Sequence, residues 1–452
     1  MSVVKSTDIR VRSAAVEFEP VPYRAPLKFG GRIVSSGWLM NVRLTVETRG
    51  GRRAEGRGSM PCGNVWAWPS GVLNPEQTEQ AMLEFARRLA LAMTVLPEPG
   101  HPLELAEQLH GVLGKLATEV PRSMGLTEPL PLLAQLVAAS PFDAAVHDAY
   151  GRVLGLNSFD TLSAEFCNRD LSAWLDDQFA GEYGDRYTRR SPAPSLPLYH
   201  LVGALDPLTP ADVVSRPADH LPVTLGEWIH ADGLTHLKIK LAGDQLEWDV
   251  ARVLAIESVA GEAQSARGCG DWWYSCDFNE KCGSAEYVVE FLRRVREGSE
   301  RAFERIQYIE QPTSRHLAAA NAPRMHAAAA IRPVVIDEAL VSYESLLMAR
   351  EQGYSGIALK ACKGQSESIL MAAAAQKYGM FLCVQDLTCP GASFLHSCAL
   401  SARIPGVAAV EGNARQYCPG ANEVWAERFP GIFRVRGGRL ETGCLTGVGL
   451  GF

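Results

Sequence analysis

The 452-residue sequence lacks the features that mark several large classes of protein. Its eleven cysteines form no C-x-x-C pair, which argues against a disulfide framework and a structural zinc site. No window holds the roughly 18 consecutive apolar residues of a membrane span, and the first 20 residues lack the apolar core of a signal peptide. Basic residues do not exceed acidic ones, and the net charge is -7, so we expect neither nucleic acid nor membrane as a partner. These absences predict a soluble, cytoplasmic protein.

The patterns that are present divide the chain into two main parts. Residues 8–50 alternate like strands and include a hairpin turned at Gly50 and Gly51, and helical periodicity follows, so an α+β domain is predicted over residues 1–155. Residues 156–194 are polar and irregular, which indicates an insertion or linker. From 195 to 424, eight short apolar strands alternate with stretches of helical spacing. This count favours a (β/α)₈ barrel.

The second of these strands, residues 236–241 (HLKIKL), alternates apolar and basic residues. Lys238 and Lys240 would therefore lie on one face of the strand. Lysines on the solvent face of an edge strand protect against aggregation, which is the simpler interpretation of an isolated segment. Alternatively, both ammonium groups point into a closed barrel, where buried lysines need charged partners or a chemical role.

Acidic residues favour the second interpretation. Asp277, Glu310 and Asp337 end three consecutive strand candidates, about one βα unit apart, so they should meet at the same rim of the barrel. Any one of them would also fit a helix cap or a turn. Three carboxylates together repel one another unless a cation lies between them, and oxygen ligands suit Mg²⁺. Lys240 ends the strand before this series, and Lys360 ends the strand after it.

This ordered set resembles the enolase superfamily, and within it the muconate lactonizing enzyme subgroup of the mandelate racemase and muconate lactonizing enzyme family. The matching elements are K-x-K at Lys238 and Lys240, D-x-N at Asp277, EQP at Glu310, DE at Asp337 and ALKACKG at Lys360. Outside the barrel, YRAPLKFGG is similar to the family's mobile specificity loop. TGVGLGF is similar to its C-terminal closing segment.

The resemblance implies a modified TIM barrel, (β/α)₇β, in residues 195–424, covered by an α+β N-terminal capping domain that residues 425–452 complete. It implies Mg²⁺ held by Asp277, Glu310 and Asp337, and a small-molecule carboxylate as substrate. The implied chemistry is abstraction of the proton α to that carboxylate, giving an enediolate. We also expect a homo-oligomer.

The lysines receive roles within this chemistry. A lysine base must be neutral near pH 7, and a second ammonium nearby favours the neutral form, so Lys238 is expected to assist Lys240 and to bind the substrate carboxylate. Lys360, on the other face of the substrate, would act as acid, base or stabilising cation. Two opposed lysines suit a racemase or epimerase, and they also suit a cycloisomerase. A lyase, either a dehydratase or similar to o-succinylbenzoate synthase, and a non-catalytic binding protein on the same fold remain alternatives.

The remaining candidates concern specificity and support. Asp386 is expected either to bind a substrate ammonium, which slightly favours an amino-acid derivative or dipeptide, or to cap a helix. A catalytic His paired with Asp386 is absent, which weighs against an acid-sugar dehydratase. Lys363 is expected to be solvated. Four further residues are expected to bind substrate or support the metal ligands: Asn279, Glu338, Arg24 and Lys28.

Overall fold

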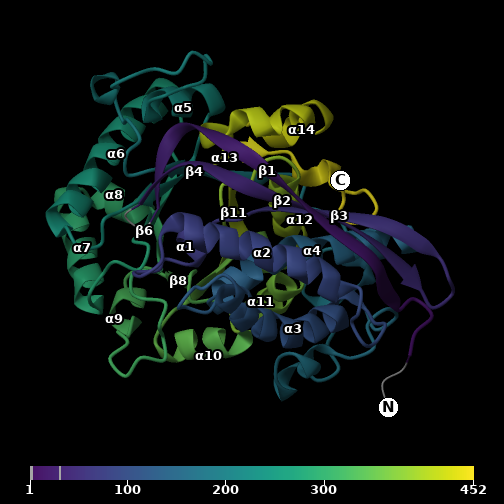
Figure 1. Ribbon diagram of the computed structural model, residues 1–452. Helices are drawn as coiled ribbons and strands as arrows, with labels where there is room; N and C mark the ends of the chain where they lie inside the picture. Colours follow the sequence, from purple (N-terminus) through teal and green to yellow (C-terminus); the bar gives the residue numbers. More distant parts are fainter. Residues whose placement is uncertain (1–3, 30–31) are drawn as a thin grey trace.

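The computed structural model describes residues 4–29 and 32–452 of the chain (Figure 1). Its first domain contains a three-stranded antiparallel sheet in the order β1 (Ile9–Phe29), β2 (Arg32–Thr48) and β3 (Arg53–Pro61). The β2–β3 hairpin turns at Gly50 and Gly51, as predicted, and Gly51 has a φ of 81° that favours glycine. Four helices follow the sheet: α1 (Asn64–Ala67), α2 (Pro75–Met93), α3 (Pro102–Ser123) and α4 (Leu132–Leu154).

The segment predicted as a loop, YRAPLKFGG, is strand through Phe29, and its last residues, Gly30 and Gly31, lie outside the described ranges. The β1–β2 register shifts between Pro22 and Leu27, where prolines interrupt the ladder of N–H donors, and pairing then resumes with Leu27 opposite Val34. Leu27 is 1% exposed and packs beside Leu201 of the barrel. Burial of this leucine explains why the segment is ordered as strand.

The second domain is a closed barrel of eight parallel strands, which confirms the predicted fold. The strands are hydrogen-bonded in sequence order, and β11 pairs with β4 to close the circle. A short strand, β12 (Arg439–Leu440), adds antiparallel to β4. The barrel strands are β4 (Leu196–Val202), β5 (His236–Lys240), β6 (Trp273–Asp277), β7 (Ile306–Glu310), β8 (Val334–Ile336), β9 (Gly356–Leu359), β10 (Phe381–Val384) and β11 (Val407–Glu411).

Helices surround the barrel and use the apolar residues on the outer face of each strand. In β5, for example, Leu237 and Ile239 are fully buried in the main hydrophobic core. The helices are α5 (Leu225–Asp232), α6 (Leu246–Ala266), α7 (Ala285–Gly298), α8 (Glu300–Arg305), α9 (His326–Ala329), α10 (Tyr343–Glu351), α11 (Gln365–Lys377), α12 (Ala392–Arg403), α13 (Ala414–Tyr417), α14 (Glu423–Arg428) and α15 (Pro430–Phe433).

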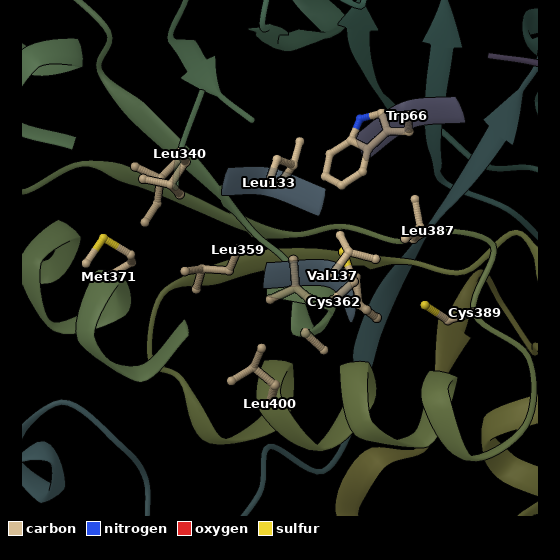
Figure 2. Packing of buried hydrophobic residues seen from close by; sticks show 14 of the residues in the cluster. Trp66, Leu133, Val137, Leu340, Leu359, Cys362, Met371, Leu387, Cys389 and Leu400 are labelled. Carbon is tan, nitrogen blue, oxygen red and sulfur yellow. The ribbon is translucent and has the colours of Figure 1, made fainter. Parts of the chain in front are cut away.

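Helix α4 joins the two domains. On one side it packs on β3 so closely that a Cβ at Gly58 would lie 1.9 Å from the carbonyl oxygen of Pro141. On the other side Leu133 and Val137 pack with apolar residues of the barrel rim and of α11 and α12 (Figure 2). The C-terminal segment also returns to this helix, because the Leu450 amide donates to Asp148 Oδ1 at 3.1 Å. The sheet and helices of the first domain therefore cover the barrel mouth as one unit.

Residues 156–194 form a succession of short 3₁₀ helices: η1 (Ser158–Thr161), η2 (Leu171–Ala173), η3 (Asp177–Phe179) and η4 (Gly184–Arg186). They pack on the outside of the barrel. The Gln376 side chain of α11 donates to the Tyr187 carbonyl, and the Arg189 amide donates to the Arg403 carbonyl at the end of α12. Among the described helices, none is both long and apolar enough to cross a membrane.

Candidate active site

The inside of the barrel changes from apolar to polar at the carboxyl ends of its strands. A fully buried apolar layer comes from six strands: Tyr199, Tyr308, Val335, Ala358, Cys383 and Ala409. Because side chains two positions apart share a face, the next inward residues on β7, β8 and β9 are Glu310, Asp337 and Lys360. On β5 and β6 the corresponding residues are Lys240 and Asp277, and strand pairing places Lys240 beside Asp277 and Asp277 beside Glu310.

Lys238 occupies the centre of this polar layer and is 1% exposed. Its Nζ donates to Glu310 Oε1 at 2.9 Å, Gln385 Oε1 at 2.7 Å and Glu411 Oε2 at 3.0 Å, and it also lies 3.2 Å from Asp277 Oδ2. An ammonium has three N–H donors, so these contacts use all of them. As positioned, Lys238 serves carboxylates of the protein, and the predicted role as anchor of a substrate carboxylate has no donor left for it.

Lys240 lies one step nearer the barrel mouth and is 6% exposed. Its Nζ contacts include Asp277 Oδ2 at 2.5 Å and Asn279 Oδ1 at 2.9 Å. Asn279 and Glu280 have positive φ values of 42° and 69°, an uncommon conformation for residues other than glycine. This backbone conformation turns the chain sharply after β6, so that the Asn279 side chain reaches back to Lys240.

Asp337, at the end of β8, is held by two lysines. Lys360 Nζ lies 2.9 Å from Asp337 Oδ2, and Lys363 Nζ lies 3.2 Å from Oδ1 and donates to the Asp337 carbonyl at 2.5 Å. Both lysines are 4% exposed. The prediction that Lys363 is solvated is therefore wrong. The 3₁₀ turn η6 (Ala361–Lys363) folds Lys363 back toward Asp337, and a spacing of three residues does not reveal that turn.

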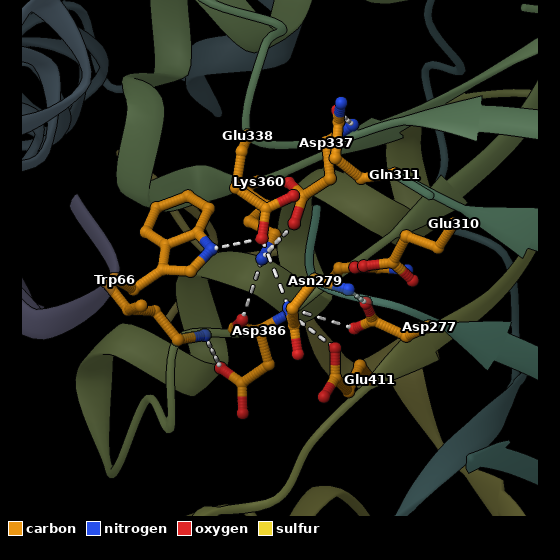
Figure 3. A network of polar contacts seen from close by, with 12 residues as sticks. Trp66, Asp277, Asn279, Glu310, Gln311, Asp337, Glu338, Lys360, Asp386 and Glu411 are labelled. Atoms are coloured by element: carbon orange, nitrogen blue, oxygen red, sulfur yellow. Dashed lines mark hydrogen bonds and ion pairs between the residues drawn. The ribbon is translucent and has the colours of Figure 1, made fainter. Parts of the chain in front are cut away.

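Trp66, from α1 of the capping domain, lies beside Lys360 (Figure 3) and also contacts Lys363. Its ring centroid lies 4.2 Å from Lys360 Nζ and 5.6 Å from Lys363 Nζ, which is cation–π geometry. The indole N–H donates to Glu338 Oε1 at 3.0 Å, and the side-chain Nδ2 of Asn279 donates to the same oxygen at 3.1 Å. Trp66 therefore connects the capping domain to Glu338 and to the lysines after β9.

Burial and crowding shift the pKa values of these groups in opposite directions. Burial raises the pKa of Glu310 well above its ordinary value, and the neighbouring Asp277 adds to that effect. For Lys360, burial alone would lower the pKa, but Asp337 outweighs it and the pKa is raised. Burial and Asp337 also raise the pKa of Glu338 to about 7. The site therefore favours a charged Lys360 and disfavours ionisation of Glu310 and Glu338. At Asp277 and Asp337 burial is outweighed by the neighbouring lysines, which lower the pKa values of both carboxyl groups.

Residues 223–452 match the protein family described as enolase C-terminal domain-like. This match covers half of the chain and includes β5 to β11, with every acid and lysine described above. The chain belongs to that family. No curated protein matches the sequence.

Solved structures that resemble this enolase-family chain share its whole architecture. A dipeptide epimerase from Enterococcus faecalis complexed with Mg and L-Leu-L-Tyr has a TM-score of 0.62 at 15% identity, covering 98% of this chain and 99% of that one. An enolase from Bradyrhizobium complexed with magnesium and mandelic acid has 0.61 at 15%, covering 99% and 96%. A muconate lactonizing enzyme from Pseudomonas fluorescens complexed with muconolactone has 0.59 at 18%, covering 98% and 96%. At these identities the likeness concerns the fold.

The side chains at the mouth of this enolase-family barrel are of the chemical kind that divalent cations prefer as ligands. Six buried carboxyl groups gather there with four buried lysines: Asp277, Glu310, Asp337, Glu338, Asp386 and Glu411 with Lys238, Lys240, Lys360 and Lys363. Oε2 of Glu338 has no hydrogen-bond partner in the described structure. Across residues 4–29 and 32–452, however, no three acidic, histidine or cysteine side chains converge closely enough to hold a metal. Each carboxylate of the predicted metal ligands contacts a lysine instead: Asp277 with Lys240, Glu310 with Lys238, and Asp337 with Lys360.

The other sequence-predicted residues lie in different surroundings. The carboxylate of Asp386 accepts three backbone N–H bonds, from Leu387 and Cys389 at 2.9 Å and from Asn413 at 3.0 Å. Arg24 is bound to Asp219, with Nη2–Oδ1 at 3.1 Å, and its side chain is 9% exposed. Asp386 thus holds the loop after β10 and does not cap the following helix, α12, whose N-cap residue is Gly391. Arg24 links the hairpin to a barrel loop.

Lys28 is the specificity candidate that lies nearest a cavity. It lines a cleft of about 490 Å³ together with Lys240, Asn279, Lys281 and Trp248. A second cleft of about 610 Å³ reaches Asn279 and Glu338 from the side of Trp66. Both volumes are in the range of small-molecule sites. Asn279 therefore separates two clefts that lead to the polar layer.

Three residues that bind the side chains or the backbone of the polar layer were not predicted from the sequence: Gln311, Gln385 and Glu411. Gln311, with a φ of 28°, accepts from the Asp337 amide at 2.9 Å and so fixes the end of β8. Gln385 follows β10 directly and Glu411 ends β11, as Asp277 ends β6, and both contact Lys238. The signal that identified the acids, a polar residue at a strand end, was present at these two positions as well.

Proposed function

We propose that this protein is a divalent-metal-dependent enzyme that removes the proton α to the carboxylate of a small molecule. Return of a proton to the same carbon gives racemisation or epimerisation, whereas loss or capture of a lactone oxygen at the neighbouring carbon gives cycloisomerisation. The observation that carries the proposal is the placement of two lysines. Lys240 ends β5 and Lys360 follows β9, and strands four apart in a closed barrel of eight lie on opposite sides. Asp277, Glu310 and Asp337 occupy the arc between them.

Mg²⁺ is the cation we propose for Asp277, Glu310 and Asp337, because carboxylate oxygens are its preferred protein ligands. When bound, it would supply the positive charge that stabilises an enediolate. It would also favour the ionised forms of Glu310 and Glu338, whose pKa values burial raises. The lysines that now bind the carboxylates would then be available for the substrate.

The chain's own residues would divide the proton transfers by face. A substrate lying across the barrel mouth has Lys240 on one face and Lys360 on the other. Lys360, whose pKa Asp337 holds above its ordinary value, starts as the charged acid and donates a proton from its Nζ. Lys240 takes the proton on the opposite face, and Asn279 Oδ1, 2.9 Å away, orients its Nζ. The Trp66 ring covers Lys360 Nζ and would shield it from solvent on the side of the capping domain.

The substrate is proposed only as a carboxylate with a group that fits the cleft lined by Lys28, Lys281 and Trp248. Because Asp386 is used by three backbone N–H groups, the reason for favouring an amino-acid derivative or dipeptide is gone. Lys28 and Lys281 would favour an anionic or polar substituent.

Solvent exchange tests the proposal. Enantiopure carboxylates, including dipeptides, N-acyl amino acids and lactones, are incubated with enzyme and Mg²⁺ in D₂O, and α-deuteration is followed by NMR. We expect Lys240→Ala and Lys360→Ala each to abolish exchange from one enantiomer and to spare exchange from the other. Absence of exchange from every carboxylate would contradict the proposal. An unsaturated or keto product without label in recovered substrate would indicate a lyase instead.

A further inference from the structure

Helix α11 begins immediately after the turn that carries Lys360 and Lys363, and it has no cap of its own. The residue at its N-cap is Gly364, with φ 112° and ψ 145°, which provides no side chain to accept the first N–H groups. A helix start normally needs such an acceptor, because its first four N–H groups lack partners within the helix.

The missing acceptor comes from the capping domain. Asp143, in the middle of α4, accepts from the Ser366 amide through Oδ2 and from the Ser366 hydroxyl through Oδ1, both at 2.7 Å. One turn further along α4, His147 Nε2 lies 2.9 Å from the same hydroxyl. Both side chains are buried. The first turn of a barrel helix is thus fixed by two residues of a different domain.

Gly364 is required for this arrangement. A Cβ built there would lie 3.2 Å from Asp143 Oδ2, and the φ of 112° is one that other residues rarely adopt. A side chain at position 364 would therefore crowd Asp143 and require an unfavourable backbone conformation. In this chain Asp143 accepts the hydrogen bond that a local cap residue would otherwise accept.

The first turn of α11 is in turn bonded to Lys360. Ser368 Oγ donates to the Lys360 carbonyl at 3.2 Å, and only the short turn η6 separates the two elements. The other end of Lys360 also meets the capping domain, since its Nζ lies 4.2 Å from the centre of the Trp66 ring. The capping domain consequently holds Lys360 both at its backbone, through α11, and at its ammonium group.

We propose that Asp143 is a positioning residue for Lys360: through Ser366 it sets the start of α11 and so the distance of the Lys360 ammonium from the substrate. This inference rests on the proposed function for its effect on turnover. Asp143 touches no reacting atom. Its effect should be confined to the face of the substrate that Lys360 serves.

The test compares Asp143→Ala with Asp148→Ala. Asp148 is also a buried aspartate of α4, but among the described residues it binds the Arg57 and Leu450 amides and the Arg152 side chain, and no residue of α11. α-Deuteration of the two substrate enantiomers is measured separately for each variant. For Asp143→Ala we expect exchange through Lys360 to fall on the order of 10- to 100-fold, as small displacements of a reacting group do, and exchange through Lys240 to stay within about 2-fold. For Asp148→Ala both rates should change equally or not at all.

Equal losses on both faces in Asp143→Ala would overturn the proposal, because they would indicate a general loss of structure. Ser366→Ala provides a milder variant in case Asp143→Ala fails to fold. It removes only the hydroxyl contacts with Asp143 and His147, and the Ser366 amide remains bound. The same one-sided loss, smaller in size, is expected.

A second measurement needs no substrate. Amide hydrogen exchange of residues 360–368 is followed by mass spectrometry for the native protein and the three variants. Loss of the cap should speed exchange there about 5-fold in Asp143→Ala and leave it unchanged in Asp148→Ala. Unchanged exchange in Asp143→Ala would overturn the inference even if a substrate is known. If no carboxylate exchanges its α-proton, the proposed function fails, and this measurement still decides whether Asp143 fixes the Lys360 turn.

Discussion

Replacement of Lys238 by methionine tests the charge balance of the barrel mouth. Met has a similar length and leaves the apolar stem in place, but it removes the ammonium that contacts Asp277, Glu310 and Glu411. These carboxylates have side chains that are 0 to 3% exposed, so solvent cannot replace the lost charge. Removing one partner of a buried ion pair costs about 3–5 kcal/mol. We expect the free energy of unfolding without metal to fall by about that amount.

Metal should reverse part of this loss. In the native protein Lys238 competes with any cation for the carboxylates of Asp277 and Glu310, and in Lys238→Met this competition is gone. A ligand at 100 times its Kd stabilises the folded state by about 2.7 kcal/mol, and a tighter Kd raises that value. Added Mg²⁺ should therefore stabilise Lys238→Met more than the native protein.

Urea denaturation with EDTA and with a series of Mg²⁺ concentrations measures both effects. Lys377→Met serves as a control, because Lys377 pairs with Glu182 at 3.0 Å with its side chain 22% exposed, and loss of such a pair costs about 1 kcal/mol or less. If Lys238→Met were no less stable than Lys377→Met, or if Mg²⁺ stabilised it no more than it stabilises the native protein, the assigned role of Lys238 as the central counter-ion would be refuted.

Three further predictions address the metal, the aromatic cover and pH. Asp277→Asn should abolish Mg²⁺ binding measured by calorimetry and all α-deuteration, whereas Asp244→Asn, at the rim of the Lys28 cleft, should keep both. Trp66→Phe should keep most of the activity through Lys360, because the ring remains, and Trp66→Ala should lose it; equal losses would assign the effect to the indole N–H bond to Glu338. Burial, with Asp143 and Glu344, raises the pKa of Glu367 from 4.5 to about 8. The folded state therefore binds this proton more tightly than the unfolded state does. The stabilisation that Glu367 contributes is lost as pH rises from about 4.5 to 8. Glu367→Gln should therefore gain stability over the native protein from pH 5 to pH 9 in urea titrations, and an unchanged difference would contradict that pKa.

The sequence was sufficient for the barrel because each strand had to satisfy two independent patterns. Apolar residues face the helices, and a polar residue ends the strand at the mouth, so Asp277, Glu310 and Asp337 identified both a strand and its register. The orientation of Lys238 and Lys240 followed from the same alternation, and the structure places both inside the barrel. Closure also placed Lys360 opposite Lys240.

Contacts between distant segments could not be predicted in this way. Lys363 turns inward because η6 folds the chain back. Trp66 reaches the site from the capping domain, and no periodic pattern in that part of the sequence indicates a contact with the barrel. Asp386 has a carboxylate that could bind a ligand. Its actual partners are backbone N–H groups of the loop after β10 and of the turn after β11. Such contacts depend on tertiary distance, to which local periodicity is insensitive.

The 3₁₀ segment at 156–194 has a consequence for how the barrel is supported. Its side chains bind α10, α11 and α12, through the Tyr343 hydroxyl on Asp176 at 2.6 Å, Gln376 on the Tyr187 carbonyl and Arg403 on Asp160. Helices α10 and α11 follow the strands that carry Asp337 and Lys360, whereas the cleft lined by Lys28 and Lys240 opens over the loops after β4, β5 and β6. Different parts of the chain therefore support the two sides of the barrel mouth. Residues 156–194 hold the helices behind Lys360, whereas the capping hairpin holds the loop after β4, on the side of Lys240, through Arg24 and Asp219.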